Sequence, residues 1–233
     1  MMYDLQCAIY AVGIPTGQFS VFETMPVVYL LILAVAAYLL GSLPFSVWIG
    51  KLFFSTDVRN HGSKNPGATN TFRVLGIKAG LPVLILDVLK GYGAVMLVAL
   101  FEPDTEIYNV ILLKLIAGAC AFAGHIFPVF AGFKGGKGVA TMLGAILAIH
   151  IYPALVSIGI FIAVVLLTRY ISLGSISGAI TYPFSVLLIF RPAGTVMIIF
   201  SISVAAIIII THSKNIRRLI NNEESKIRLP TSE

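Results

Sequence analysis

Long apolar runs separated by shorter polar stretches dominate the chain. Most of these runs approach the roughly 20 residues that an α-helix needs to cross a bilayer. They predict an all-α integral membrane protein, a bundle of about seven transmembrane helices formed by a single domain over residues 25–233. The expected segments are 26–50, 80–101, 108–130, 138–150, 152–168, 173–190 and 193–211. The fourth is short, either a half-helix or one arm of a bent hairpin with the fifth, so five or six spans also fit the pattern.

Composition agrees with this class of protein. Hydrophobic residues make up 58% of the chain and charged residues only 11%, whereas a soluble domain carries about 25% charged residues. All of the 16 Lys and Arg residues except Lys90, Lys114 and Arg191 fall in the tail or in loops expected on one side of the membrane. Because cytoplasmic loops are enriched in basic residues, this side is expected to be cytoplasmic. Seven helices then place the N-terminus outside and the C-terminus in the cytoplasm.

The first 24 residues differ from a secretory signal peptide, because they contain acidic residues but no Lys or Arg. Met25 stands directly before the first apolar run, so residues 1–24 are expected to be a poorly ordered extension or to lie upstream of the true start. The two cysteines, Cys7 and Cys120, predict no disulfide framework. The four histidines lack zinc-binding spacing, and no metal site is expected.

A glycine- and lysine-rich loop, Gly132-Phe133-Lys134-Gly135-Gly136-Lys137-Gly138, precedes the fourth apolar segment. Glycines allow backbone N–H groups to converge on an anion, and lysines add positive charge. A helix beginning at Gly138 would also direct its N-terminus at the anion. A P-loop is excluded, because Gly138 stands where that motif has Ser or Thr. Close helix packing is the alternative explanation for Gly132 and for Gly144, which follows in the next segment.

The loop after the first segment, residues 57–73, is rich in Gly, Ser, Asn and Thr, which are turn formers and short hydrogen-bonding residues. Arg73 adds a guanidinium group suited to bidentate phosphate contact. This density of polar side chains predicts a second contribution to an anion site. The alternative is a solvated connector.

The tail provides a third candidate. On a last helix that continues past the membrane, His212 and Asn215 share one face at the cytoplasmic end. A histidine titrates near neutral pH and can move a proton, although a histidine at a helix end is commonly an interfacial anchor. Arg217 and Arg218 are interpreted as lipid headgroup anchors.

Two charged residues lie inside the second apolar segment. Asp87 and Lys90 are one helical turn apart and can form an ion pair. Charges inside a membrane usually face a wet or functional interior, so Lys90 is expected to reach the same site as the loops.

Taken together, these motifs resemble the bacterial membrane-bound acyl-phosphate:glycerol-3-phosphate acyltransferases, the PlsY family, from about Tyr29 to Lys226. The matching motifs are Gly41-Ser42-Leu43-Pro44-Phe45, residues 62–70, Asp87-x-x-Lys90-Gly91, Gly124-His125, residues 133–141, Arg169-Tyr170-x-Ser172-x-x-Ser175, and His212 to Asn215-Ile216 through Glu224-x-Lys226. Two positions depart from the family pattern. Lys64 stands where Gly is common, and Asn222-Glu223 replaces a usual Gly-Thr pair, which leaves the match of Glu224 to the family glutamate less direct.

The resemblance implies transfer of a fatty acyl group from acyl phosphate to the 1-hydroxyl of glycerol 3-phosphate, with lysophosphatidic acid and phosphate as products. It implies a catalytic set of Ser63, Arg73, Lys137, His212 and Asn215. It implies substrate-binding roles for Asn65, Gly67, Thr69, Asn70, Lys90, Gly135, Gly136, Gly138 and Ser175. Asp87 and Glu224 are expected to be structural. No cofactor is expected. The expected partners are the two substrates and membrane lipid, without nucleic acid, for a monomer in the bacterial inner membrane whose active site faces the cytoplasm.

Several alternatives remain at this stage. His212 could orient the acceptor hydroxyl or accept its proton, and the substrate phosphate could be the base instead. Ser63 could bind phosphate or act as a nucleophile. A transporter of an organic phosphate or other anion, or a lipid-binding structural protein, would also use a basic face. Acyltransferases with a His-x-x-x-x-Asp pair are disfavoured, because none of the four histidines has Asp five positions on.

Overall fold

A computed structural model describes residues 27–100, 107–189 and 194–227. The described parts are helices and their connections, with no strand among them. The proposed extension over residues 1–24 lies outside the described residues. The α-helices are α3 (Val27–Gly41), α4 (Phe45–Phe54), α5 (Ala68–Leu75), α6 (Ile77–Met96), α7 (Ile107–Ile126), α8 (Val139–Ile149), α9 (Ile151–Thr168), α10 (Ile171–Ile189), α11 (Thr195–Thr211) and α12 (Ser213–Ile220), with 3-10 turns at Val58–Asn60, Leu97–Leu100 and Val129–Ala131.

Five candidate spans are long and apolar enough to cross a membrane within the described ranges: Val27–Phe54, Ile77–Leu100, Val110–Ala131, Ile151–Thr168 and Ile171–Ile189. A sixth arises if α11 and α12, bent by 60°, form one broken span. The fourth predicted segment is α8, which has only 11 residues. The structure therefore supports an all-helical membrane protein with five or six candidate spans.

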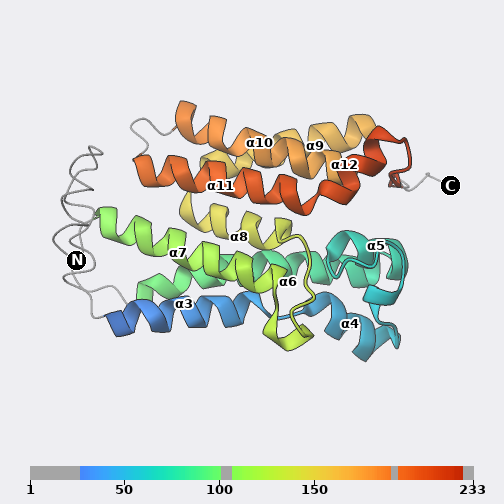
Figure 1. The fold of residues 1–233 in the computed structure, drawn as a ribbon, viewed down its shortest axis with the longest axis horizontal. Helices are drawn as coiled ribbons and strands as arrows, with labels where there is room; N and C mark the ends of the chain where they lie inside the picture. Colours follow the sequence, from blue (N-terminus) through green and yellow to red (C-terminus); the bar gives the residue numbers. More distant parts are fainter. Residues whose placement is uncertain (1–26, 101–106, 190–193, 228–233) are drawn as a thin grey trace.

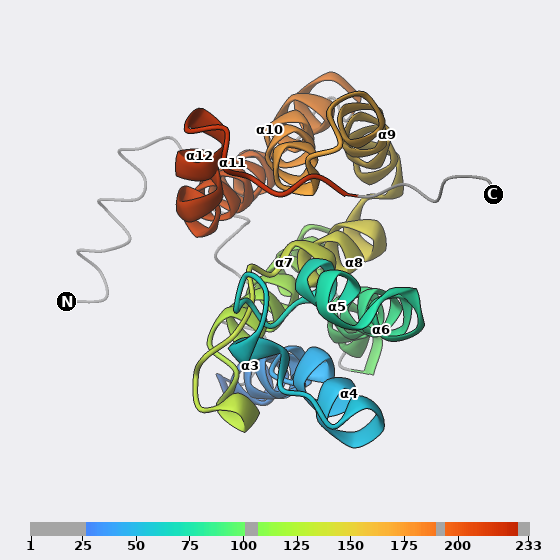
Figure 2. The ribbon, with the colours of Figure 1, turned by 90° about the vertical axis from the view of Figure 1, so that its right-hand side faces the viewer.

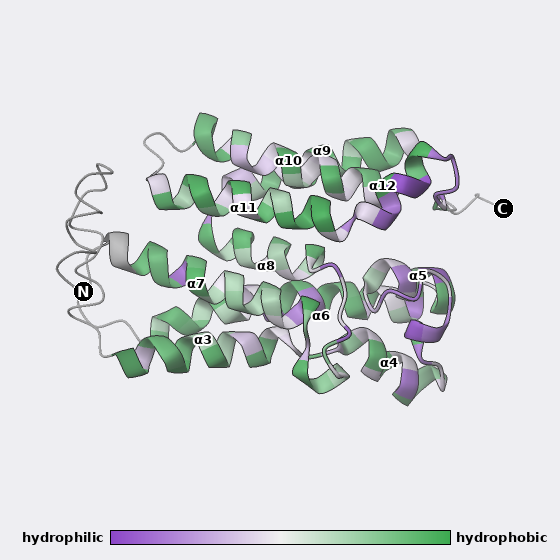
Figure 3. Ribbon diagram, viewed as in Figure 1, coloured by the Kyte–Doolittle hydropathy of each residue, from purple (hydrophilic) through white to green (hydrophobic). Residues whose placement is uncertain are grey.

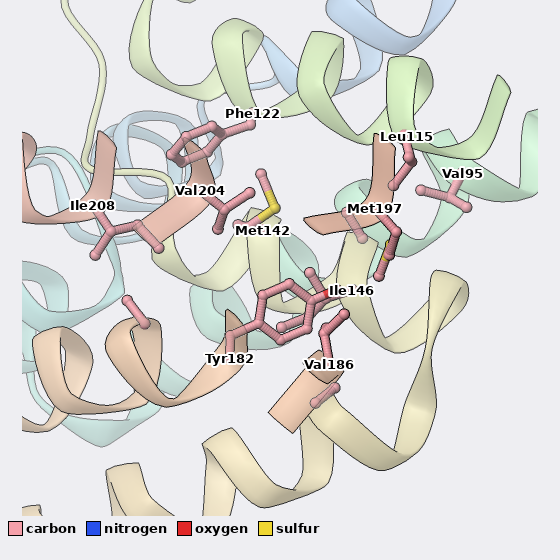
Figure 4. Close-up of a cluster of buried hydrophobic side chains, with 13 residues drawn as sticks. Val95, Leu115, Phe122, Met142, Ile146, Tyr182, Val186, Met197, Val204 and Ile208 are labelled. Atoms are coloured by element: carbon pink, nitrogen blue, oxygen red, sulfur yellow. The ribbon is translucent and has the colours of Figure 1, made fainter. Parts of the chain in front are cut away.

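The helices form two groups that lie side by side (Figures 1 and 2). In one group α3 packs against α7, α6 packs against α8, and α5 lies against α6. In the other group α10 packs between α9 and α11. The short helix α8 faces the second group, and its side chains share a buried apolar cluster with those of α10 and α11 (Figure 4). This cluster joins the two groups.

The crossing of α6 and α8 depends on two glycines. A Cβ atom on Gly144 would collide with the carbonyl oxygen of Val88, and one on Gly91 would collide with that of Thr141. Small residues at such crossings allow two backbones to approach closely in a membrane. This close approach fixes the start of α8 relative to the middle of α6.

Two polar segments differ from the prediction: part of the loop over residues 57–73 is helical, and the last helix is bent. The end of the loop expected over residues 57–73 is helix α5, which begins after Gly67 and ends at Gly76, a residue with φ of 77°. The last helix is not one straight helix, because the chain bends by 60° at His212 between α11 and α12. The hydrophilic residues gather at the end of the molecule that holds α5 and α12 (Figure 3).

Candidate active site at the polar end of the bundle

The loop between Val58–Asn60 and α5 is shaped by the buried side chain of Asn70. Its Nδ2 donates to the carbonyl oxygens of Val58 (2.8 Å) and His61 (3.1 Å), and its Oδ1 accepts from the backbone N–H of Ser63 (2.8 Å). These three hydrogen bonds fold the loop back over the start of α5. Asn70 was predicted to bind substrate; in the structure its amide group holds the shape of the loop, and its contact with substrate stays a prediction.

The glycine- and lysine-rich loop owes its shape to close packing. A Cβ on Gly135 would collide with the carbonyl oxygen of His125, and one on Gly136 would collide with the His125 ring. The N–H of Gly136 already donates to the His125 carbonyl (3.1 Å), so it is not available to an anion. Close packing against His125 therefore explains why these two positions are glycine, and their role in substrate binding stays a prediction. Gly138, with φ of 77°, forms the N-cap of α8.

The tail after α12 is held by the carboxylate of Glu224. Its Oε1 accepts from Ser172 Oγ at the start of α10 (2.8 Å) and from Asn215 Nδ2 on α12 (2.6 Å), and its Oε2 accepts from Arg218 Nε (2.7 Å). Asn215 in turn accepts a short hydrogen bond from Lys137 Nζ through its Oδ1. One partly buried carboxylate thus links the tail, α10, α12 and the lysine of the glycine loop.

The charges of this network follow from its burial and its contacts. Burial lowers the pKa of Lys137 to about 8, and the positive charges of Arg218 and Arg73 add to the effect, while Glu224 opposes it. Burial acts to raise the pKa of Glu224, but the hydrogen bonds from Arg218, Asn215 and Ser172 hold this pKa below its ordinary value. At neutral pH the lysine is mostly protonated and the glutamate is ionised.

His212 stands at the bend between α11 and α12 and is buried. Its Nδ1 lies 2.8 Å from the carbonyl oxygen of Ile208. Because a carbonyl oxygen only accepts, Nδ1 carries the proton and Nε2 holds the free lone pair. Burial lowers the pKa of His212 to about 4, with a further contribution from the charge of Lys137. The imidazole is therefore neutral, with Nε2 as its basic atom.

These groups surround a cavity of about 340 Å³ between the two helix groups. Its mouth is polar and draws on both loops, the start of α10 and the tail, with Ser63, Asn65, Gly67, Thr69, Asn70, Arg73, Lys137, Gly138, Ser172, Ser175, His212, Asn215, Glu224 and Ser225 among the lining residues. The interior is apolar, with side chains from α6, α8, α9, α10 and α11. One continuous cavity therefore has a polar end and an apolar end.

Three helices begin at the mouth of this cavity. The lining includes Ala68 and Thr69 from the first turn of α5, Val139 and Ala140 from that of α8, and Ile171 from that of α10. The first N–H groups of a helix lack partners within the helix, and its dipole is positive at this end. Convergent helix N-termini, together with the cations of the mouth, favour a bound anion such as phosphate.

Lys90 is not brought into this cavity. Its ammonium group pairs with Asp87 (2.7 Å) and donates to the carbonyl oxygen of Leu43 (2.8 Å), which the break between α3 and α4 leaves without a helical partner. Lys90, Gly135 and Gly136 instead line a neighbouring cavity of about 10 Å³. In this structure Lys90 stabilises the break in the first span, and its role in substrate binding stays a prediction. Asp87 lines both cavities and contacts His125, whose Nδ1 lies 3.6 Å away.

Sequence reasoning left three residues of the site unassigned. Ser172 and Arg218 bind Glu224, and Tyr182 lines the apolar interior. Ser172 lies in a motif that carried the resemblance, but Arg218 was interpreted as a lipid anchor and Tyr182 is part of an unremarkable apolar run. Within residues 27–100, 107–189 and 194–227, no three His, Cys, Asp or Glu side chains lie close enough to hold a metal ion.

The two departures from the family pattern occupy a special backbone conformation. Lys64 has φ of 59° and Asn222 has φ of 57°, both in the left-handed region that glycine prefers. Both side chains are exposed. The chain therefore keeps the backbone turn of a glycine position while carrying a larger residue there.

The sequence of the chain is similar to those of known proteins. A family model described as glycerol-3-phosphate acyltransferase matches residues 31–222. A glycerol-3-phosphate acyltransferase of Chlorobium phaeobacteroides (strain BS1) is 40% identical over 228 residues, which cover 85% of this chain and 97% of the relative. One of Listeria monocytogenes serotype 4a (strain HCC23) is 41% identical over 199 residues, with the same shares covered.

Two solved structures are also similar. The crystal structure of PlsY, an integral membrane glycerol 3-phosphate acyltransferase, in its glycerol 3-phosphate form has a TM-score of 0.76 and 39% identity, covering 86% of this chain and 96% of that one. The lysophosphatidic acid form of the same protein has a TM-score of 0.73 and 37% identity, with the same coverage.

The left-handed position of Lys64 makes a stability prediction. Lys64→Gly is expected to raise the free energy of unfolding by about 0.5–1 kcal/mol. Removing the Cβ relieves a strain of about 1–2 kcal/mol in this region, and the greater flexibility of glycine in the unfolded chain offsets only part of that stabilisation. Thermal unfolding in detergent measures the change. Gly62→Ala is the control with the opposite expected sign. Gly62 has φ of 58° in the same loop, so adding a Cβ there should lower the free energy of unfolding. A lower melting temperature for Lys64→Gly would show that the lysine side chain makes a stabilising contact.

Proposed function

The chain belongs to the glycerol-3-phosphate acyltransferase family, and from that premise we propose that it transfers a fatty acyl group from acyl phosphate to the 1-hydroxyl of glycerol 3-phosphate. The products are lysophosphatidic acid and inorganic phosphate. The observation that carries this proposal is the cavity, which joins an anion-favouring mouth to an apolar interior. An acyl phosphate has the same two parts in the same order.

The related PlsY structures are described as glycerol 3-phosphate and lysophosphatidic acid forms, which supports this acceptor and this product. Both proposed substrates carry phosphate. The mouth offers Arg73, Lys137 and three helix N-termini to receive it. A transporter would place its polar groups near the middle of the membrane, whereas here they lie at one end (Figure 3).

In the proposed reaction the 1-hydroxyl oxygen attacks the carbonyl carbon of the acyl phosphate, and an ester bond forms. The bond between that carbon and the phosphate oxygen breaks, and phosphate leaves with the bonding electron pair. Lys137 and the helix N-termini stabilise the negative charge on the leaving phosphate, so catalysis comes from positioning and electrostatics. The mixed anhydride of the acyl phosphate is already activated, so the proposed reaction uses no cofactor.

The hydroxyl proton has two acceptors within this scheme. Nε2 of His212 carries a free lone pair at the mouth, and the departing phosphate is itself a base. Ser63 is assigned to phosphate binding, because the loop holds its backbone beside Asn70. In either case the proton ends on inorganic phosphate, and the enzyme returns to its starting state.

The proposal also specifies the setting of the site. The proposal takes α8 and α11 as crossings in addition to the five candidate spans, which makes seven crossings for the one domain over residues 25–233. The end that carries the cavity mouth faces the cytoplasm of a bacterial inner membrane, because its loops hold most of the basic residues. All proposed site residues come from one chain, which suits a monomer.

An assay of the purified protein tests the donor. Palmitoyl phosphate and glycerol 3-phosphate should give equal amounts of lysophosphatidic acid and phosphate, whereas palmitoyl-CoA should give none. Lys137→Ala should lower kcat/KM by about 10²–10³, because it removes a cation from the developing phosphate charge.

Lys134→Ala is the matched control for that assay. Lys134 lies in the same loop, is exposed and does not line the main cavity, so this variant should stay near the activity of the unmodified protein. Equal activity with palmitoyl-CoA would refute the choice of donor. Equal losses in the two lysine variants would refute the role of Lys137.

The low pKa of Lys137 predicts a pH dependence. Only the protonated amine binds phosphate, so kcat/KM for glycerol 3-phosphate should fall as the pH rises through about 8. In the Lys137→Arg variant the fall in kcat/KM should occur only above about pH 10, because an arginine stays protonated there. Initial rates over a pH series, corrected for spontaneous hydrolysis of acyl phosphate, provide the measurement. An alkaline limb at the same pH in both proteins would show that another group is responsible.

A further inference from the structure

The inner end of the cavity is closed by Tyr182. This residue is 1% exposed although it lines the cavity. Figure 4 shows its ring directed from α10 toward Ile146 of α8, and both residues belong to the buried cluster that joins the two helix groups. Ile146 and Val204, which also line the cavity, are 6% and 4% exposed. This end is therefore sealed from lipid.

The wall that α9 contributes is more open. Ile162 of α9 lines the cavity and is 48% exposed, so its side chain faces both the cavity and the lipid side of the bundle. An acyl chain from the membrane has an entry at this wall, whereas the inner end offers none. Ile162 therefore marks the entry for the acyl chain, and Tyr182 marks the floor of the cavity.

The depth from mouth to floor follows from helix geometry. Ser172 and Tyr182 are ten residues apart on α10, which corresponds to about 15 Å at 1.5 Å per residue. From His212 to Val204 on α11 the distance is about 12 Å, and from Val139 to Ile146 on α8 it is about 10 Å. Three helices with nearly parallel axes thus agree on a depth of about 10–15 Å (Figure 1).

This depth corresponds to a definite length of hydrocarbon. An extended chain advances about 1.2 Å per bond, since an extended polypeptide advances about 3.6 Å over three bonds. With the carbonyl group at the mouth, the cavity encloses about 8–12 bonds of an acyl chain. A longer chain would reach the ring of Tyr182.

The hydroxyl group of Tyr182 adds a second cost for such a chain. Its oxygen is buried and has no hydrogen-bond partner in the part of the chain that the structure describes. A polar group of this kind is usually satisfied by water or a ligand. Hydrocarbon cannot hydrogen-bond to this hydroxyl, so a chain packed against the floor leaves it unpaired, which is unfavourable.

We propose that Tyr182 is a specificity-determining residue that forms the floor of the acyl-chain cavity and sets the preferred length of the acyl donor. This inference rests on the proposed function, since it concerns the donor of the same reaction. Each methylene that enters the cavity should raise kcat/KM about fourfold until the chain meets the floor. Beyond that point, kcat/KM should level off or fall.

The test measures kcat/KM for saturated acyl phosphates of roughly 8 to 18 carbons, a range that brackets the estimated depth. The unmodified protein should show a break point near about 12 carbons. Tyr182→Ala should move it to longer chains by about four carbons, because the side chain no longer blocks the floor. Tyr182→Phe is the matched control, since it keeps the ring and should keep the break point.

A second variant should act in the opposite direction. Ala179 lines the cavity one turn nearer the mouth on the same face of α10, so Ala179→Leu should move the break point to shorter chains. Opposite shifts in two folded variants cannot come from general destabilisation. An unmodified protein that turns over acyl phosphates but shows the same break point as both variants would overturn the inference and leave the proposed function intact. No product with any acyl phosphate would overturn both.

Discussion

The carboxylate of Glu224 is the constraint on which the arrangement of the mouth depends. A partly buried charge needs compensating partners, and this one finds them in Ser172, Asn215 and Arg218. The three partners come from α10 and α12, while Glu224 itself lies in the tail. Satisfying one charge therefore ties α12 and the adjoining tail to the start of α10, where Ser172 lies 52 residues earlier in the sequence than Glu224. Through Asn215 the order extends to Lys137, in the loop between α7 and α8.

The tail has further attachments beside this charge. The N–H of Ile227 donates to the carbonyl oxygen of Arg169 (2.9 Å), and the ammonium group of Lys226 lies 5.3 Å from the centre of the Tyr170 ring. Together with Glu224 they hold the tail across the end of α9 and the start of α10. The polar mouth is thus assembled where the two helix groups meet, directly above the apolar cavity. This arrangement suits a reaction between a water-soluble phosphate and a lipid.

The spans and the site were predictable from the sequence to different degrees. Runs of apolar residues are local signals, so the spans and the shortness of α8 could be predicted. The positions of Arg73, Lys137, His212 and Asn215 followed from motifs, and all four line the cavity. Local composition could not show how the glycines are used. Gly135 and Gly136 pack against His125, a contact with the end of α7 that no spacing rule encodes.

Other features depended on contacts between distant residues. Lys90 was expected in the site, but the break in the first span presents the Leu43 carbonyl oxygen to its ammonium group. Arg218 was assigned to lipid, but Glu224 lies within its reach once the tail turns back at Asn222. The bend at His212 was missed because the apolar run and the polar tail also fit one continuous helix. Only the packing of the tail against α10 distinguishes these structures.

The most direct test of this account is the equilibrium affinity of Glu224→Gln for glycerol 3-phosphate, measured by titration calorimetry beside the unmodified protein. If Glu224 serves to order the mouth, the substitution should weaken binding about tenfold, because Arg218 loses its charged partner and Asn215 no longer holds Lys137 firmly. The same substitution in a Lys137→Ala background should then have a much smaller effect. If Glu224 acted only as a negative charge beside the phosphate, removing that charge would strengthen binding, and unchanged or tighter affinity would contradict the account.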